Sequence, residues 1–192
     1  MKTIKENIEN LLEIKNSKFI SIIIRINDKN INSYLEDIKI KYPKATHYCY
    51  AYIYNNDKRS SDDGEPSGTA GMPILNVLEK ENLNNVLVVV VRYFGGIKLG
   101  AGGLVRAYTK SVTEALKKAD YIELMEGHKV LIEFNYNDEK QINYILGDSQ
   151  VIDKSYNENI SYTTLVSKEV LAKLHNYNYK VLDNLYIEKK NS

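Results

Sequence analysis

Val86-Leu87-Val88-Val89-Val90-Val91 is the most apolar run in the sequence, and it leads into the glycine-rich stretch Gly95-Gly96-Ile97-Lys98-Leu99-Gly100-Ala101-Gly102-Gly103. Six aliphatic residues in succession predict a strand that is covered on both faces. The residues that follow, roughly 104–119, predict a helix with an apolar face that includes Val105 and Tyr108. The sequence therefore places a glycine-rich loop between a buried strand and the N-terminus of a helix.

The chemistry of such a loop favours anions, because the free N–H groups at a helix start carry partial positive charge and glycine lets a ligand approach the backbone. Three cations flank the glycines and add to this charge. The candidate binding residues of the loop are Arg92, Gly95, Gly96, Lys98, Gly100, Gly102, Gly103 and Arg106. No standard nucleotide motif is present, since no G-K-[ST] closes the loop and Val105 stands where G-x-G-x-x-G needs its third glycine. A tight turn whose glycines serve packing alone is the alternative.

A polar segment, residues 60–73, precedes the buried strand and contributes further candidates. Its acidic residues could hold a hard cation such as magnesium. Their spacing is not that of a calcium loop, and acidic turn residues commonly hydrogen-bond to nearby backbone, so we assign no metal site. The candidate binding residues of this region are Asp62, Asp63, Glu65 and Thr69, together with His47 on the strand before it.

The same residues raise the question of catalysis. His47 and Cys49 share one face of a strand, because side chains alternate along it. A cysteine nucleophile also needs a base and an electropositive pocket, and the pattern favours a buried, structural Cys49. We therefore assign no catalytic residue and no cofactor.

Composition sets broad limits. The chain has 192 residues, 43% of them hydrophobic and 27% charged, as in an ordinary globular protein. The net charge of +1 gives no overall attraction to nucleic acid or membrane, although residues 1–122 carry 18 Lys and Arg against 14 Asp and Glu, and residues 123–192 carry 8 against 11. One cysteine excludes an internal disulfide framework, and no signal peptide or membrane-length apolar segment is expected. These features are typical of a cytoplasmic protein that does not enter a membrane.

Periodicity predicts an α+β fold with two domains, 1–122 and 123–192, joined by a short linker at 123–127. In the first domain we expect a helix at about 31–42 capped by Asn27 or Asp28, a polar loop at 55–69, and a helix that starts at Pro73 with Thr69 as a possible cap. The expected strands are 18–25, 45–54 and 86–91, with a possible earlier one near 10–15. The second domain reads as strand 128–136, helix 138–146, strands 151–155 and 161–167, helix 168–174 and strand 181–187. This β-α-β-β-α-β order is the ferredoxin-like arrangement.

Three segments in order resemble the signature blocks of the IMPACT/YigZ family. They are Ala45-Thr46-His47-Tyr48-Cys49-Tyr50-Ala51-Tyr52, then residues 61–73 from Ser61-Asp62-Asp63-Gly64-Glu65 to Met72-Pro73, then residues 91–108 from Val91-Arg92-Tyr93-Phe94-Gly95-Gly96 to Arg106-Ala107-Tyr108. Tyr48 stands where many members have asparagine.

The resemblance implies a first domain like the α/β modules of ribosomal proteins and elongation-factor domain IV, rather than a doubly wound sheet. It implies a second domain similar to the ferredoxin-like domains of elongation factor G, and a role around translation. Eukaryotic relatives regulate a stress kinase of translation with help from a different extra domain, so that specific function does not transfer.

Three functions remain open. The glycine loop could bind an RNA or ribosome phosphate backbone while the acidic second domain contacts a protein or ribosomal surface; no DNA specificity is inferred. The same surface could instead serve a protein-interaction adaptor. In the third, His47, Asp62, Asp63 and Glu65 form a hydrolase or phosphotransfer site for a phosphorylated small molecule, which requires them to converge in one pocket.

Overall fold

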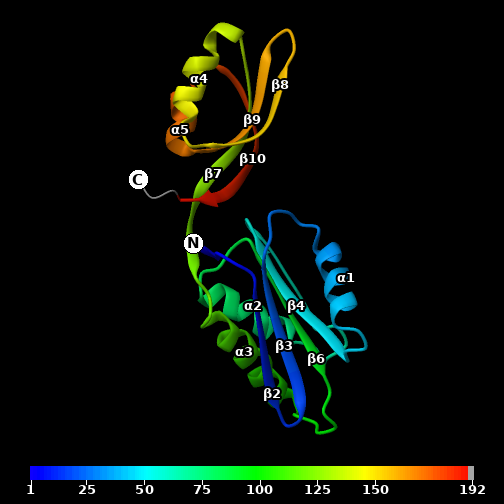
Figure 1. Cartoon of the computed structure of the whole chain (residues 1–192). Helices are drawn as coiled ribbons and strands as arrows, with labels where there is room; N and C mark the ends of the chain where they lie inside the picture. The colour runs from blue at the N-terminus through cyan, green and yellow to red at the C-terminus, as the bar shows by residue number, and fades with distance from the viewer. Residues whose placement is uncertain (190–192) are drawn as a thin grey trace. The chain divides into compact units, whose positions relative to one another are not determined.

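The computed structural model describes residues 1–189 and shows an α+β protein with two sheets (Figure 1). The chain forms two compact units, Met1–Ile122 and Glu123–Ser192, which are described separately. No helix among the described residues is long and apolar enough to cross a membrane.

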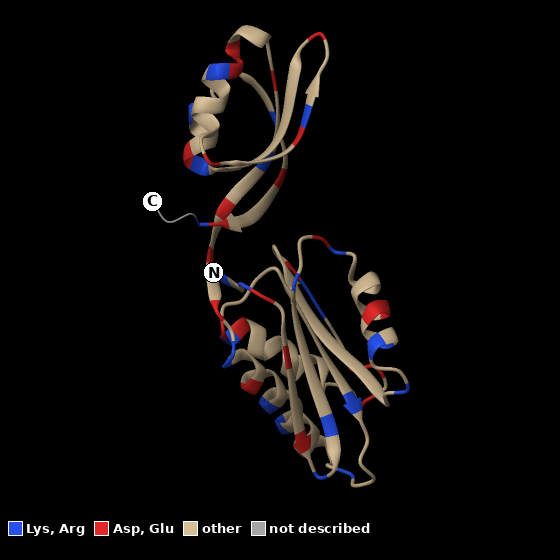
Figure 2. Ribbon diagram, viewed as in Figure 1, with Lys and Arg blue, Asp and Glu red and all other residues tan. Residues whose placement is uncertain are grey.

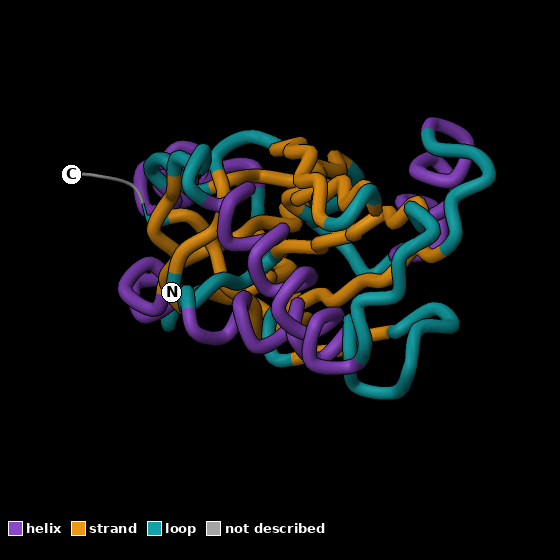
Figure 3. The backbone as a smooth tube through the Cα atoms, turned by 90° about the horizontal axis from the view of Figure 1, so that it is seen from below, coloured by secondary structure: helices purple, strands orange, loops and turns teal. Residues whose placement is uncertain are grey.

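The first unit is built on a sheet with the strand order β2-β3-β6-β4-β5, in which all neighbours are antiparallel. Its strands are β2 (Ile8–Ile14), β3 (Ser17–Arg25), β4 (His47–Tyr54), β5 (Asp57–Ser61) and β6 (Val86–Tyr93). Its helices are α1 (Ile31–Lys41), α2 (Gly71–Lys80) and α3 (Ala101–Leu116), and a short strand β1 (Lys2–Ile4) forms a bridge to Leu83. Figure 3 shows the chain from below, with the helices in purple and the strands in orange.

Strand β6 is covered on both faces, as its sequence predicts. Val86, Val88 and Val90 lie in one core cluster with residues of α2 and α3. Leu87, Val89 and Val91 lie in a second cluster with Ile31 and Ile38 of α1. An unbroken aliphatic run is stable here because helices exclude water from both sides of the sheet.

Several local expectations for the first unit are wrong. The polar loop 55–69 contains β5, an edge strand with partly exposed polar side chains that pairs with β4. Helix α3 begins at Ala101 and ends at Leu116, and Val105 is 38% exposed instead of facing the core.

The expected helix caps also differ. Helix α1 has Asn30 at its N-cap without a side-chain cap, and the Asp28 carboxylate accepts a hydrogen bond from the Asn30 N–H. Helix α2 has Ala70 at its N-cap, and the Thr69 hydroxyl donates to the Pro66 carbonyl (2.6 Å). In both cases the polar side chain stabilises the preceding turn instead of the helix end.

The second unit has the expected β-α-β-β-α-β order. Its elements are β7 (Tyr121–Phe134), a 3-10 turn η1 (Tyr136–Asp138), α4 (Glu139–Leu146), β8 (Gln150–Tyr156), β9 (Ile160–Ser167), α5 (Lys168–Lys173) and β10 (Asn178–Glu188). The strands are antiparallel neighbours in the order β10-β7-β9-β8. Every second residue of β9, from Ile160 to Val166, is buried, so one face of this sheet forms the core.

The expected linker at 123–127 is not a loop. These residues lie within β7, and their partners on β10 run from Glu188 opposite Leu124 to Leu185 opposite Gly127. Glycine and glutamate are poor strand formers, but backbone pairing with β10 overrides that preference.

Candidate functional site

The acidic loop that follows β5 is held by the carboxylate of Asp62. This half-buried carboxylate accepts hydrogen bonds from the N–H groups of Gly68 (2.8 Å), Ala70 (3.0 Å) and Gly71 (2.8 Å). Burial raises the pKa of Asp62, but the three backbone bonds outweigh it and the pKa lies below its ordinary value. Asp62 therefore closes the loop and fixes the start of α2, which leaves it little capacity for a ligand.

His47 and Asp63 join the same loop to strand β4. The Asp63 carboxylate accepts from the Tyr48 N–H (2.6 Å), and the Asp63 carbonyl lies 2.8 Å from His47 Nδ1. A carbonyl can only accept, so Nδ1 carries the proton in this bond. Nε2 then faces Glu65, with 3.7 Å between Nε2 and Oε2.

A buried polar cluster lies behind His47, and we call it the Glu65 cluster: Cys49, Glu65, Arg92 and Tyr108. Glu65 Oε1 accepts from Arg92 Nη1 (2.5 Å) and from the Tyr108 hydroxyl (2.8 Å). The single proton of the Cys49 thiol is shared between two acceptors, the Asp62 carbonyl (2.9 Å) and the Tyr108 hydroxyl (3.2 Å). Each of the four residues is less than 9% exposed, so the charges of Glu65 and Arg92 neutralise each other inside the protein.

Arg92 is also enclosed by aromatic rings. Its guanidinium carbon lies 5.3 Å from the ring centroid of Phe19 and 5.6 Å from that of Phe94. The expectation that Arg92 flanks the glycine loop as an accessible cation is wrong, because its side chain is only 5% exposed and is paired with Glu65. The same holds for Glu65, whose side chain is 3% exposed.

The Glu65 cluster fixes both ends of the glycine loop. Arg92 lies near the end of β6, just before the loop, and Tyr108 lies in α3, just after it. One carboxylate oxygen accepts from both side chains, so Glu65 fixes the position of β6 relative to α3. The sequence predicts Tyr108 on the apolar face of the helix, and an inward tyrosine indicates a buried partner for its hydroxyl, but only the fold shows that this partner is Glu65.

The loop glycines serve two purposes. A Cβ on Gly95 would lie 2.0 Å from the carbonyl carbon of Asn16, and the Gly95 N–H donates to Ser17 Oγ, so this glycine is required by packing. Gly100 is the N-cap of α3 at φ +72° and offers no side chain to the first N–H groups of the helix. Packing therefore explains why a glycine is needed at position 95. It does not explain the glycine at position 100, where an added Cβ would meet no atom within 4 Å.

The exposed part of the candidate site is smaller than the sequence suggests. We call it the loop arc: Gly96, Lys98, Gly100, Gly102 and Arg106. Lys98 and Arg106 are exposed, and a Cβ on Gly102 would lie 3.5 Å from Arg106 Nη1, so this guanidinium lies beside the first turn of α3. Gly103 faces Leu99, while Thr69 is buried. Helix α3 carries Arg106 and Lys110 and one acidic residue, Glu114, and Figure 2 shows both colours along this helix.

The contacts of His47 meet the enzyme hypothesis only in part, and the buried side chains near it are poorly suited to catalysis. His47 approaches the Glu65 carboxylate, but its contact with Asp63 is to the backbone carbonyl, and the carboxylates of Asp62 and Asp63 accept from backbone N–H groups instead of joining it. In addition, burial raises the pKa of the Cys49 thiol to about 12, which keeps it protonated at neutral pH. Burial also raises the pKa of Tyr108, so its hydroxyl stays a donor to Glu65.

Comparison with known proteins shows the family to which this domain belongs. Residues 15–116, which include the Glu65 cluster and the loop arc, match the model of the Impact N-terminal domain. The chain belongs to the IMPACT family. The IMPACT family member YvyE of Bacillus subtilis is 40% identical over 173 residues, covering 87% of this chain and 80% of that protein. The IMPACT family member YigZ of Escherichia coli is 32% identical over 189 residues, covering 92% and 93%.

The IMPACT family resemblance read from the three sequence blocks is thus confirmed. A crystal structure described as that of a hypothetical protein aligns with a TM-score of 0.72 and 28% identity, and it covers 98% of both chains. The similarity spans both units, so the two-unit α+β architecture is shared with that protein.

Proposed function

We propose that this IMPACT family member is a translation-associated regulatory protein that binds RNA or the ribosome through the loop arc. The observation that carries the proposal is the open N-terminus of α3, which has no side-chain cap and lies beside the Arg106 guanidinium. Unpaired helix N–H groups and a nearby guanidinium together favour a phosphate group. Lys98 adds a second exposed cation from the same loop.

The proposal extends to the organisation of the chain. We propose that residues 1–122 form an IMPACT-type N-terminal domain of the ribosomal-protein and elongation-factor domain IV kind, and that residues 123–192 form a ferredoxin-like domain. The element order and antiparallel strand order of the second unit support this assignment. The acidic second domain would contact a protein or ribosomal surface, and we place the protein in the cytoplasm.

The test is the salt dependence of RNA binding. The full chain and a Lys98→Ala/Arg106→Ala variant are titrated into a fluorescent single-stranded RNA at several salt concentrations. Each lost phosphate contact lowers the log–log salt slope by about 0.7. We expect the double variant to bind more weakly and with a flatter slope, whereas a Lys39→Ala/Lys80→Ala variant, which removes two exposed lysines on other helices, leaves both unchanged. An unchanged affinity in the loop variant contradicts the proposal.

Arg92 is not a suitable probe of phosphate binding. Its replacement would leave Glu65 as a buried, unpaired charge and destabilise the fold. Loss of binding by an Arg92→Ala variant would therefore report on folding rather than on contact with RNA.

A protein-interaction adaptor is the second candidate, and one observation favours it. The segment from Phe94 to Val105 exposes three large apolar side chains, Phe94 (46%), Ile97 (45%) and Val105 (38%). Apolar contacts depend little on salt, so a protein partner predicts binding that persists at high salt and weakens in an Ile97→Ser/Val105→Ser variant. A hydrolase or phosphotransfer reaction has less support, because the Glu65 cluster is buried and internally neutralised.

A further inference from the structure

Strand β2 is an open edge of the first sheet. It pairs with β3 alone in the described sheet order of that unit. The two strands are joined by a two-residue turn, Lys15-Asn16, with φ of 45° and 61°, and the closing pair is Ile14 opposite Ser17. In such a hairpin the closing pair is hydrogen-bonded and bonded pairs then alternate. The backbone N–H and C=O groups of Glu9, Leu11 and Glu13 therefore point away from β3.

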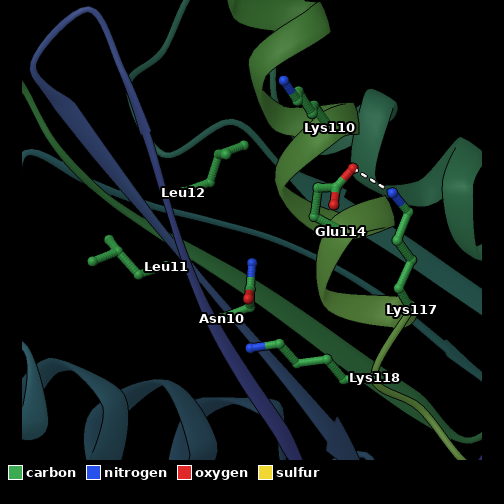
Figure 4. A pocket seen from close by; sticks show the side chains of 7 residues that line it. All are labelled: Asn10, Leu11, Leu12, Lys110, Glu114, Lys117 and Lys118. Atoms are coloured by element: carbon green, nitrogen blue, oxygen red, sulfur yellow. Dashed lines mark hydrogen bonds and ion pairs between the residues drawn. The ribbon is translucent and has the colours of Figure 1, made fainter.

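A cavity of about 520 Å³ lies between this edge and α3. Its lining residues are Asn10, Leu11, Leu12, Lys110, Glu114, Lys117 and Lys118. Figure 4 shows Leu12 on the α3 side of β2 and Leu11 on the opposite side of the strand. The cavity thus borders the middle of the free strand edge, at residues 10–12.

The charge of this cavity is positive. Glu114 forms an ion pair with Lys117, with 2.7 Å between Oε1 and Nζ. Lys110 and Lys118 add two positive charges that this single carboxylate does not balance. An acidic group in the cavity would therefore gain attraction without displacing the existing pair.

The other face of β2 is different. Glu9 forms an ion pair with Lys41 (2.6 Å), and Leu11 is 52% exposed beside it. An added strand would hence meet lysines on one face and an exposed leucine on the other. Because side chains alternate along a strand, the two faces select alternate residues of the partner.

We propose that the β2 edge, together with Lys110 and Lys118, binds an extended acidic segment of a protein partner as an added strand. The backbone groups of Glu9, Leu11 and Glu13 supply the strand pairing, and the partner presents acidic side chains toward α3 and apolar side chains toward Leu11. With seven residues in β2, the bound segment is of about that length.

An RNA backbone fits this surface less well. It would satisfy the lysines, but the outward carbonyl groups of the edge and the carboxylates of Glu9 and Glu13 would face a continuous polyanion. The surface shares no residue with the loop arc: Lys110 lies one helical turn beyond Arg106, and Lys117 and Lys118 follow the end of the 16-residue helix α3, whereas the loop arc lies at its start. The inference is thus independent of the proposed phosphate site.

Selection from a random peptide library tests the proposal. A display library of 12-residue peptides is selected on the immobilised full chain and, in parallel, on a Lys110→Glu/Lys118→Glu variant. We expect wild type to enrich peptides with Asp or Glu at alternate positions, and the best of them to bind the variant at least about tenfold more weakly. A Lys39→Glu/Lys80→Glu variant carries the same charge change on α1 and α2 and is expected to bind within about twofold of wild type. Equal binding to all three proteins, or the absence of acidic enrichment, overturns the proposal.

Amide exchange measured by NMR separates strand addition from simple charge attraction. With the enriched peptide bound, the amides of Glu9, Leu11 and Glu13 are expected to exchange more slowly, while unchanged exchange at all three contradicts strand pairing. In a parallel titration, a 12-nucleotide polyuridine that binds more tightly than the peptide and loses affinity in the Lys110→Glu/Lys118→Glu variant would assign the surface to nucleic acid instead. Thermal unfolding of each variant shows that the protein under test is folded.

Discussion

At the scale of single residues, Glu65 has the largest structural role in the candidate site. Its carboxylate is the partner of a buried arginine and a buried tyrosine, and it lies beside His47. Removing one member of a buried ion pair is costly because the other member keeps its charge without compensation. The residue therefore stabilises the loop geometry rather than offering a charge to a ligand.

Glu65→Gln is expected to lower the free energy of unfolding by about 3 kcal/mol, because Arg92 loses its counter-charge in the interior. Urea denaturation measures this loss. The matched control is Glu79→Gln, which removes an exposed pair with Lys58 and is expected to cost less than about 1 kcal/mol. Equal losses of unfolding free energy in the two variants would show that the buried Glu65–Arg92 pair stabilises the fold no more than an exposed pair does.

Asp62 should make stability depend on pH. Its pKa is lowered in the folded state, so its contribution is present above the unfolded-state pKa, near 4, and is lost as the pH falls through the folded-state value. Asp62→Asn is expected to cost about 2 kcal/mol at pH 7. Denaturation curves at pH 7 and pH 3 should show this difference from wild type shrinking in acid, and a constant difference contradicts the assignment.

Cys49 is expected to be unreactive in the native protein. Burial raises the pKa of its thiol to about 12, and its side chain has no exposure. Iodoacetamide at pH 8 should leave the folded chain unmodified and add one group after unfolding in urea, as measured by intact mass. Rapid alkylation of the folded chain would mean that the thiol is accessible, which the structure excludes.

At the scale of elements, the glycine loop depends on contact with the β2–β3 hairpin. Gly95 leaves no room for a side chain against Asn16, whereas Gly96 has φ +85° and no atom within 4 Å of an added Cβ. The two neighbours therefore restrict the loop for different reasons, one by packing and the other by backbone conformation.

Gly96→Ala is expected to cost about 1 kcal/mol, the penalty of placing a side chain in the left-handed region. Gly95→Ala should cost clearly more, about 3 kcal/mol, because the hairpin backbone must move to admit the methyl group. Chemical denaturation of the two variants compares these losses directly. A Gly95→Ala variant as stable as Gly96→Ala would show that the backbone of the β2–β3 hairpin can move away from the added methyl group at little cost in free energy.

Elements also show how far the sequence alone can be read. The six-residue run from Val86 to Val91 predicted β6 and its two covered faces, because a long aliphatic run has few other stable positions. Residue pattern did not predict strand β5, because Asp57–Ser61 is polar. It lies at the sheet edge, where pairing with one neighbour is enough to form a strand. Its backbone pairing with β4 is a tertiary fact that local composition does not express.

At the scale of the whole molecule, charge is modest. The net charge is +1, and the loop arc contains two cations, Lys98 and Arg106. A polybasic RNA-binding protein makes many phosphate contacts, whereas two contacts give a log–log salt slope of only about −1.4 for single-stranded RNA. We expect the measured slope of the full chain to lie near this value, and a slope several times steeper would require cations beyond the loop arc.

The sequence by itself determined the strand and helix order of the second unit, the order of the first unit except for β1 and β5, the buried position of β6 and Cys49, and membership of the IMPACT family. These follow from local periodicity and from motif spacing, which are properties of neighbouring residues. Only the tertiary structure decided that Arg92 and Glu65 belong to the interior while Lys98 and Arg106 remain exposed. Arg92 meets its partner 27 positions away and lies between the rings of Phe19 and Phe94. Whether a charge is free or neutralised depends on such distant contacts, and the residues adjacent to it in sequence do not reveal them.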